Sequence, residues 1–314
     1  MVDREDFEFD SRGTTCRAWF YPAQNESMDS PDGVPAIVMA HGLGGTRDAG
    51  LEPYAAAFAD AGLAVLVFDY RYFGASGGRP RQLLSVSAQL ADWSAAIAAV
   101  REIEGVDAER IALWGTSFSG GHVIAAGAAD KRVAAISAQG PMMDGRAAVL
   151  NVLRRHGLWH MLRLITAGLR DSLADLAGAE PYRIPLVARA GGLAAMATAD
   201  AYDGYQAIAP EDWRNEMSAR MLLTLALYRP GRKIERLRCP TLIQICDEDT
   251  VAPAEAASAA AARGGDNVVE RHYRIGHFDI YRGAGYRQSS SDQLAFFKRS
   301  LAPRRCEERR ATDA

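Results

Sequence analysis

Residues 110–121 are the stretch that most restricts how this chain can fold. They read R-I-A-L-W-G-T-S-F-S-G-G. Residues 111–114 form an apolar run of the length of a buried strand, and the small residues that follow favour a helix. A serine between such a strand and helix stands at the tip of a sharp turn, which requires small residues two positions before and two positions after it. Gly115 and Ser119 meet this requirement around Ser117.

This stretch resembles the nucleophile elbow of the α/β-hydrolase family, whose pattern is G-x-S-x-G. The last glycine of that pattern is replaced here by Ser119. The resemblance implies that Ser117 is the nucleophile. Ser119 is an alternative nucleophile, because Ser117, Ser119 and Gly121 repeat the same pattern of small residues. A structural alternative is that both serines only cap the helix that follows them.

Strand and helix patterns alternate over most of the chain. Short apolar runs predict buried strands, and between them lie segments with helical spacing of apolar residues. This order predicts an α/β fold with a mostly parallel central sheet and helices on both faces, which is also the fold that the resemblance implies. Two strand-like pieces at the start predict a hairpin at one edge of the sheet. The predicted strands are 7–10, 14–21, 36–40, 63–68, 111–114, 133–138, 240–246 and 268–273, and the predicted helices of the core are 52–61, 82–104, 118–129, 254–262 and 285–301.

Residues 142–237 interrupt this alternation with segments that all have helical character. In the α/β-hydrolase family an insertion after the sixth strand forms a helical cap over the active site. The resemblance therefore implies a core of residues 1–141 and 238–303, a cap insertion of residues 142–237 and a flexible tail of residues 304–314. Helices are expected at 146–155, 158–169, 171–177, 186–196 and 211–227. Some apolar residues of the insertion suit a lid over an apolar pocket, or alternatively the insertion's own core: Met142, Met143, Trp159, Met161, Trp213, Met217 and Tyr228.

The glycine-rich segment H-G-L-G-G, residues 41–45, directly follows the strand predicted at 36–40. In the α/β-hydrolase family such a segment supplies one backbone N–H of the oxyanion hole, and the residue after the nucleophile supplies the other. The resemblance implies that Leu43 and Phe118 are these donors. A phosphate-binding role is disfavoured, because the sequence contains neither G-x-x-x-x-G-K-[ST] nor G-x-G-x-x-G. His41 is expected to be structural. The same holds for Asp69 and Arg71 in a later segment, which are expected to pair with each other.

An acidic turn and a Gly-His pair follow the last two predicted strands. The family pattern implies that Asp249 is the acid of a catalytic triad, with Asp247 and the more distant Asp144 as alternatives and a solvated acidic turn as the structural alternative. His277 is the expected general base, because imidazole can accept the serine proton and return it near neutral pH. The order Ser117, Asp249, His277 along the chain is the order of the α/β-hydrolase family.

Composition and charge exclude several other classes of function. The net charge of −3 gives no indication of a nucleic-acid partner or an anionic membrane surface. The four cysteines lie far apart without a C-x-x-C pair, so no zinc site or redox dithiol is expected. The N-terminus lacks the apolar stretch of a signal peptide and no apolar run is long enough to span a bilayer, so a cytoplasmic protein is expected.

These observations predict a serine hydrolase that cleaves the ester or thioester bond of a small acyl substrate. Neither a metal nor an organic cofactor is expected. The same triad could pass the acyl group to an alcohol or amine, or hydrolyse a carbon–carbon bond. A further alternative is a catalytically silent protein that binds ligands in the same pocket. The oligomeric state is left open, including a homodimer.

Overall fold

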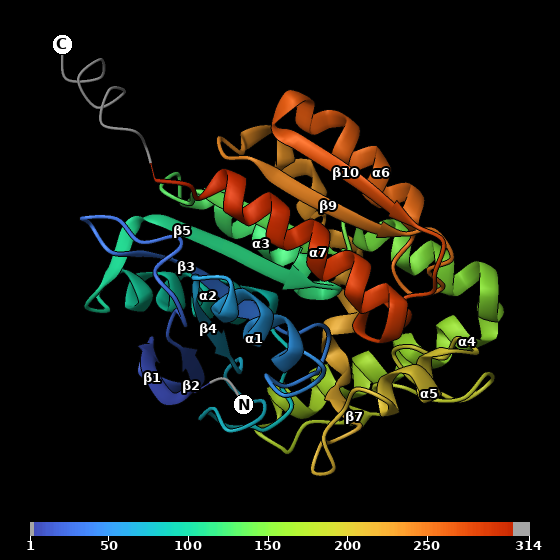
Figure 1. Cartoon of the computed structure of the whole chain (residues 1–314). Coiled ribbons are helices and arrows are strands. Elements are labelled where there is room, and N and C mark those ends of the chain that lie inside the picture. Colours follow the sequence, from blue (N-terminus) through green and yellow to red (C-terminus); the bar gives the residue numbers. More distant parts are fainter. Residues whose placement is uncertain (1–2, 304–314) are drawn as a thin grey trace.

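An eight-stranded sheet crosses the centre of the computed structural model, which describes residues 3–303 (Figure 1). The strand order is β1-β2-β4-β3-β5-β6-β9-β10. β1 and β2 form the antiparallel hairpin expected at one edge, β2 is antiparallel to β4, and the remaining pairs are parallel. The strands are β1 (Glu5–Ser11), β2 (Thr14–Tyr21), β3 (Val34–Ala40), β4 (Ala64–Phe68), β5 (Val106–Thr116), β6 (Ala135–Gln139), β9 (Thr241–Cys246) and β10 (Val268–Tyr273).

Helices cover both faces of this sheet, as the alternation of patterns predicts. One face packs on α2 (Val86–Arg101), α3 (Phe118–Ala129) and α6 (Ala254–Ala261). The other face packs on α1 (Glu52–Asp60) and α7 (Gly283–Ser300). The central strands are buried on both sides, which explains why β3, β4 and β5 contain continuous apolar runs rather than alternating ones. The predicted α/β-hydrolase fold is therefore confirmed.

The chain between β6 and β9 adds no strand to the central sheet, and all of this segment is described. It contains α4 (Gly145–Leu176), α5 (Ala201–Gln206) and a two-stranded sheet of β7 (Arg183–Ile184) and β8 (Met217–Ser218). Three 3₁₀ helices precede β9: η1 (Ala219–Leu223), η2 (Leu225–Leu227) and η3 (Pro230–Arg236). Another, η4 (Ala262–Asn267), lies between α6 and β10, and η5 (Asp279–Tyr281) precedes α7. Figure 1 shows α4, α5 and β7 together beyond one end of the large sheet.

Two expected helices of this segment are wrong. Residues 186–196 form a turn in which Val187 bridges Met196, and Gly191 has a φ of 87° that a helix does not allow. Residues 211–227 contain β8 and short 3₁₀ helices in place of one long helix. The apolar residues of both stretches are spaced as in a helix, but the chain buries several of them through turns and 3₁₀ helices instead. The helices expected at 146–155 and 158–169 lie in α4, which breaks at Gly157.

Two further expectations concern residues away from these helices. The expected pair of Asp69 and Arg71 is wrong, because Arg71 Nε donates instead to Asp92 on α2 at 2.8 Å. Asp69 accepts the backbone N–H groups of Arg47 and Ala75 at 2.7 and 3.0 Å. The tail predicted for residues 304–314 lies outside the described residues.

Candidate active site

Ser117 stands between β5 and α3 in a strained backbone conformation. Its φ is 57° and its ψ is −117°, a region that L-residues rarely adopt. The surrounding structure holds this turn, since the Ser117 N–H donates to the Gln139 carbonyl at 2.8 Å and the Ser117 carbonyl accepts from Met142 N–H at 2.9 Å. A Cβ atom at Gly115 would lie 2.3 Å from the Ser119 carbonyl oxygen, which explains why this position near the end of β5 must be glycine. Strain that is held by its surroundings in this way is typical of functional sites.

Ser117, His277 and Asp249 form one hydrogen-bonded series. His277 Nε2 lies 3.0 Å from Ser117 Oγ, and His277 Nδ1 lies 2.5 Å from Asp249 Oδ2. With its proton on Nδ1, the imidazole donates to the carboxylate and leaves Nε2 to accept the serine proton. The other carboxylate oxygen of Asp249 accepts the N–H groups of Val251 and Ala252 at 2.7 Å each, which fixes the carboxylate toward the imidazole. The sheet thus brings together three residues that are 160 positions apart at most.

The environment of His277 favours a charged imidazolium. Burial alone would lower the pKa of His277, but the carboxylate of Asp249, and more weakly that of Asp200, stabilises the charge. The net result is a pKa of His277 above its usual value. A base placed in this way can hold a proton taken from a neighbouring hydroxyl.

The alternatives to Ser117 and Asp249 have other partners. Asp247 lies 2.6 Å from Nδ1 of His272 on the surface, and Asp144 caps α4 and pairs with Arg229. The hydroxyl of Ser119 is buried against that of Tyr70. The ring of His277 is hydrogen-bonded to Ser117 and Asp249 and to none of these three alternatives.

The segment that contains Leu43 passes directly against Ser117. A Cβ atom at Gly42 would lie 2.9 Å from Ser117 Cβ, so only glycine allows this approach. Leu43, Ser117 and Phe118 all line the same cavity. Phe118 is the first residue of α3, and the first N–H groups of a helix have no acceptor within the helix. The placement of Leu43 and Phe118 suits the predicted oxyanion donors, whose role stays a prediction.

Two aromatic residues hold the segment that contains Leu43 in place. The sequence did not reveal this role for either of them. Tyr205 donates its hydroxyl to the Leu43 carbonyl at 3.0 Å, and Trp213 donates Nε1–H to the Gly44 carbonyl at 2.9 Å. Their rings stack with centroids 4.4 Å apart. Trp213 was expected only as a lid or core residue, and Tyr205 carries no motif that could have revealed its contact. Asp200 was missed for the same reason.

His41 has the structural role that was expected of it. Its Nδ1 lies 3.0 Å from the Gly42 carbonyl, so the ring braces the segment from beneath. Burial lowers the pKa of His41 to about 4, and the ring is therefore neutral near pH 7.

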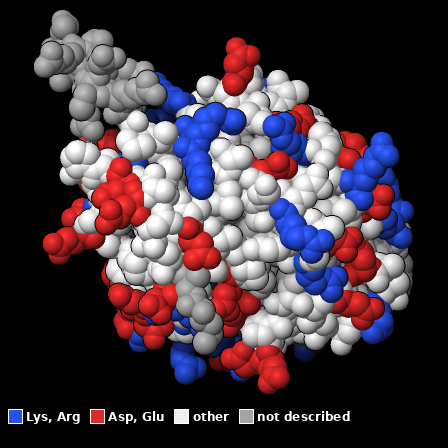
Figure 2. Space-filling model, in the orientation of Figure 1, with Lys and Arg blue, Asp and Glu red and all other residues white. Residues whose placement is uncertain are grey.

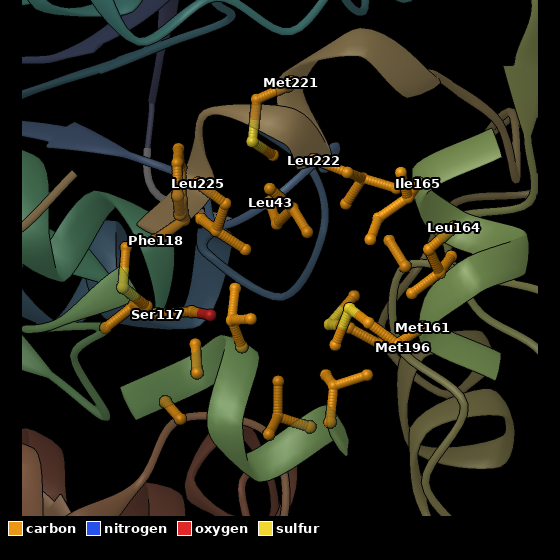
Figure 3. Close-up of a pocket in the computed structure, with 17 residues that line it drawn as sticks. Leu43, Ser117, Phe118, Met161, Leu164, Ile165, Met196, Met221, Leu222 and Leu225 are labelled. Carbon is orange, nitrogen blue, oxygen red and sulfur yellow. The ribbon is translucent and has the colours of Figure 1, made fainter. Parts of the chain in front are cut away.

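An apolar cavity of about 100 Å³ opens above Ser117 (Figure 3). The serine oxygen points into it, while α4 and the stretch around η1 and η2 supply most of the opposite wall. Among the apolar residues expected to face a pocket, Met142 and Met161 line this cavity, whereas Trp159 is 74% exposed. Labelled lining residues in Figure 3 include Met161, Leu164, Ile165, Met196, Met221, Leu222 and Leu225.

A second, smaller cavity of about 20 Å³ also reaches Ser117. Its lining mixes polar side chains, among them His277 and Thr116, with apolar ones such as Leu51 and Ile208. A cavity of this size with polar partners has room for about one water molecule. The serine therefore adjoins a larger apolar space and a smaller one of mixed lining.

Other kinds of site have little support in the described part of the chain. Across residues 3–303, no group of three or more His, Cys, Asp or Glu side chains is arranged to hold a metal ion. No helix in that range is long and apolar enough to cross a membrane. Acidic and basic side chains lie intermixed with uncharged areas on the face shown in Figure 2.

Comparisons with known proteins identify relatives of this chain and solved structures of similar fold. The family model described as "Serine aminopeptidase, S33" matches residues 31–277. The quorum-quenching protein AidA of Acinetobacter baumannii is 42% identical over 298 residues, which cover 94% of each chain. The thiohydrolase aneE of Aspergillus aculeatus is 28% identical over 278 residues, or 85% of this chain and 86% of that protein. The crystal structure of the α/β hydrolase GrgF from Penicillium, a protein also named a polyketide transferase, has a TM-score of 0.78 and 25% identity, and covers 96% of this chain and 99% of that one.

Proposed function

Because this chain belongs to the α/β-hydrolase family of enzymes, we propose that it is a serine hydrolase that cleaves an ester or thioester through an acyl-enzyme on Ser117. The observation that supports this most directly is the hydrogen-bonded series from Asp249 through His277 to Ser117. It lies at the floor of an apolar cavity, into which the serine oxygen points. A cap function of the segment between β6 and β9 belongs to the same proposal.

The first half of the reaction forms the acyl-enzyme. Ser117 Oγ attacks the carbonyl carbon while its proton passes to His277 Nε2, and Asp249 stabilises the imidazolium that results. The carbonyl oxygen becomes negatively charged and accepts hydrogen bonds from the N–H groups of Leu43 and Phe118. Loss of one such donor costs about 2.7–4 kcal/mol of transition-state stabilisation in comparable enzymes. His277 then gives its proton to the departing alcohol or thiol.

The second half releases the acid. Water gives a proton to His277 and attacks the acyl carbon, and the same N–H groups stabilise the second oxyanion. Collapse of this intermediate returns the proton to Ser117 Oγ and releases the carboxylic acid. The smaller cavity beside His277 has room for that water molecule and includes the polar side chains of His277 and Thr116 in its lining.

The substrate class follows from the walls of the larger cavity. It is lined almost entirely by aliphatic residues and methionine, so an apolar acyl group is favoured over a charged or sugar-like one. Thioesters are included because one relative is named a thiohydrolase. Lactones are included because a lactone is a cyclic ester, and because another relative is named a quorum-quenching protein.

Acyl transfer is the second candidate function, and carbon–carbon hydrolysis could use the same triad. Transfer is favoured by the relatives named polyketide transferases. In that reaction an alcohol or amine takes the place of water in the second half. Product analysis with a competing alcohol distinguishes the two, because transfer gives a new ester whereas hydrolysis gives only the free acid.

Intact-mass spectrometry after incubation with a fluorophosphonate tests the proposal. We expect a single adduct on Ser117 that is absent from Ser117→Ala and retained in the matched variant Ser119→Ala. The same proteins are then assayed with p-nitrophenyl esters, acyl thioesters and acyl lactones of increasing chain length. An adduct on Ser119 would identify Ser119, in place of Ser117, as the nucleophile. No adduct and no turnover of any substrate would favour a ligand-binding protein in place of an enzyme.

A further inference from the structure

One helix carries nearly all of the large apolar side chains that the described part of the protein leaves exposed. Apart from Leu227, every such residue lies on α4. Leu158, just after the break at Gly157, is 65% exposed, Leu176 at the end of α4 is 85% exposed, and Leu169 between them is 52% exposed. Monomeric proteins seldom leave a continuous apolar surface of this length open to water. A partner for this face is therefore expected.

Apart from Trp159, the exposed apolar residues after the break at Gly157 follow a helical period. They are separated by three or four positions and so lie on one face of the helix; we call this row the α4 seam: Leu158, Leu162, Ile165, Leu169, Leu173 and Leu176. The opposite face, which includes His160, Leu164 and Ala167, is buried against the rest of the protein. At a rise of about 1.5 Å per residue, the seam is roughly 27 Å long.

We propose that the α4 seam is a dimer interface, in which α4 pairs with α4 of a second copy in antiparallel orientation. A narrow row with three- and four-residue spacing is complementary to another helix with the same spacing. The row is nearly symmetric about its centre, to within one residue, so that Leu158 would meet Leu176, Leu162 would meet Leu173 and Ile165 would meet Leu169. A twofold axis requires this kind of self-complementary surface.

The charges at the two ends of the α4 seam favour the antiparallel orientation. Arg154 and Arg155 are exposed just before the seam begins, and Glu180, which also pairs with Arg183 at 3.4 Å, is exposed just after it ends. Antiparallel pairing places Arg154 of one copy near Glu180 of the other, whereas parallel pairing would bring like charges together. Such exposed charges select an orientation more than they add affinity.

The proposed interface adjoins the larger cavity through Ile165. This residue is 39% exposed and belongs to the α4 seam, and it also lines the cavity above Ser117. Its neighbours Met161 and Leu164 line the same wall. A second copy on the α4 seam would therefore cover the outer side of that wall and hold it in place. This consequence rests on the proposed function, but the interface itself does not.

Light scattering coupled to size-exclusion chromatography tests the interface on the full chain. We expect the mass of a dimer at micromolar concentration. The double change Leu162→Glu and Leu169→Glu should raise the dissociation constant on the order of 100-fold or more, because it places charges at the centre of the contact. Leu227→Glu is the matched control, since Leu227 is 81% exposed and lies outside the seam. Circular dichroism should show unchanged folding, because both seam positions face solvent in the monomer.

A charge exchange tests the orientation. Arg154→Glu alone and Glu180→Arg alone should each weaken the dimer by a few-fold, and the two changes together should restore it. A monomeric wild-type protein, or a dimer that the seam changes leave intact, would overturn the proposal. Co-sedimentation of a monomeric wild-type protein with phosphatidylglycerol vesicles, lost in the seam variant, would also overturn it by assigning the face to lipid.

Discussion

The carboxyl edge of the sheet and the segment between β6 and β9 face each other across the cavity, but different forces hold them. Ser117, Asp249 and His277 follow β5, β9 and β10, strands that are paired by backbone hydrogen bonds with their neighbours. The strands of the facing segment, β7 and β8, have only two residues each, and outside its helices the segment is held by scattered backbone hydrogen bonds and by side-chain contacts. One such contact is the buried carboxylate of Asp171, which binds Arg220 Nε at 2.9 Å.

This difference indicates on which side of the site residues can change without disturbing the reaction geometry. Backbone pairing fixes atoms independently of most side chains, so the sheet edge can hold a reaction geometry to a fraction of an ångström. Side-chain contacts change whenever residues change, so the facing segment can alter its cavity wall without disturbing the series from Asp249 to Ser117. Changes on the sheet side should thus reduce turnover, and changes on the facing side should redistribute substrate preference.

Asp249→Asn should have the largest effect. It leaves the shape of the turn intact but removes the charge that orients His277 and stabilises its protonated form, so kcat should fall about 10⁴-fold. Asp247→Asn is the matched control two residues away, because Asp247 bonds His272 on the surface. Steady-state kinetics on a p-nitrophenyl ester measures both. A larger loss of kcat in Asp247→Asn than in Asp249→Asn would identify Asp247 as the acid of the triad.

Gly42→Ala should come next. The added Cβ would lie 2.9 Å from Ser117 Cβ, so the segment must shift and carry the Leu43 N–H away from its place. Loss of one oxyanion donor lowers kcat by about 10²–10³-fold. The melting temperature separates this effect from unfolding. If Gly42→Ala folds normally and its kcat stays within a few-fold of wild type, Leu43 is not an oxyanion donor.

The raised pKa of His277 predicts the pH dependence of the sheet-side reaction. His277 must be neutral to accept the serine proton, so kcat/KM should fall by about tenfold per pH unit below its pKa and level off above it. Because Asp249 raises that pKa, the midpoint of this fall in kcat/KM should lie above pH 6.5 in the wild type. In the residual activity of Asp249→Asn, the midpoint should move to lower pH. A pH–rate profile of both proteins checks the direction of this shift. A midpoint that moved to higher pH in Asp249→Asn would contradict the prediction.

Val152→Phe tests the opposite side of the comparison. Val152 of α4 lines the larger cavity, and a phenyl ring there should shorten the acyl chain that is accepted. Discrimination between chains that differ by one methylene is worth about 10-fold or more in such pockets. Leu153→Phe is the control, because Leu153 is adjacent but outside the cavity lining. The ratio of kcat/KM for short and long esters should change only in Val152→Phe, with the short-chain kcat retained.

The same contrast explains how far the sequence could predict the structure. Buried parallel strands leave apolar runs that are visible in one dimension, so the core strands and the motifs at their ends, including Ser117 and His277, were predicted at the right places. The facing segment is buried irregularly, and the helix expected at 186–196 proved to be a turn closed by Val187 and Met196. Hydrogen-bond partners that depend on how helices pack on the sheet could not be predicted from the sequence either, as the pairing of Arg71 with Asp92 shows.

Tyr205 is the residue where the two regions meet, and it predicts the smallest effect. It lies on α5, in the segment that faces the sheet edge, yet its hydroxyl holds the Leu43 carbonyl at 3.0 Å. Tyr205→Phe removes one hydrogen bond of about 0.5–1.5 kcal/mol without changing the stacking on Trp213. If the donor geometry depends on this contact, kcat should fall a few-fold with KM unchanged for esters of every chain length. Tyr202→Phe, on the same helix and over Arg189, should leave kcat unaltered. An effect of Tyr205→Phe that varied with chain length would instead place Tyr205 among the residues that select the substrate, and the division between a catalytic side and a substrate side would no longer hold there.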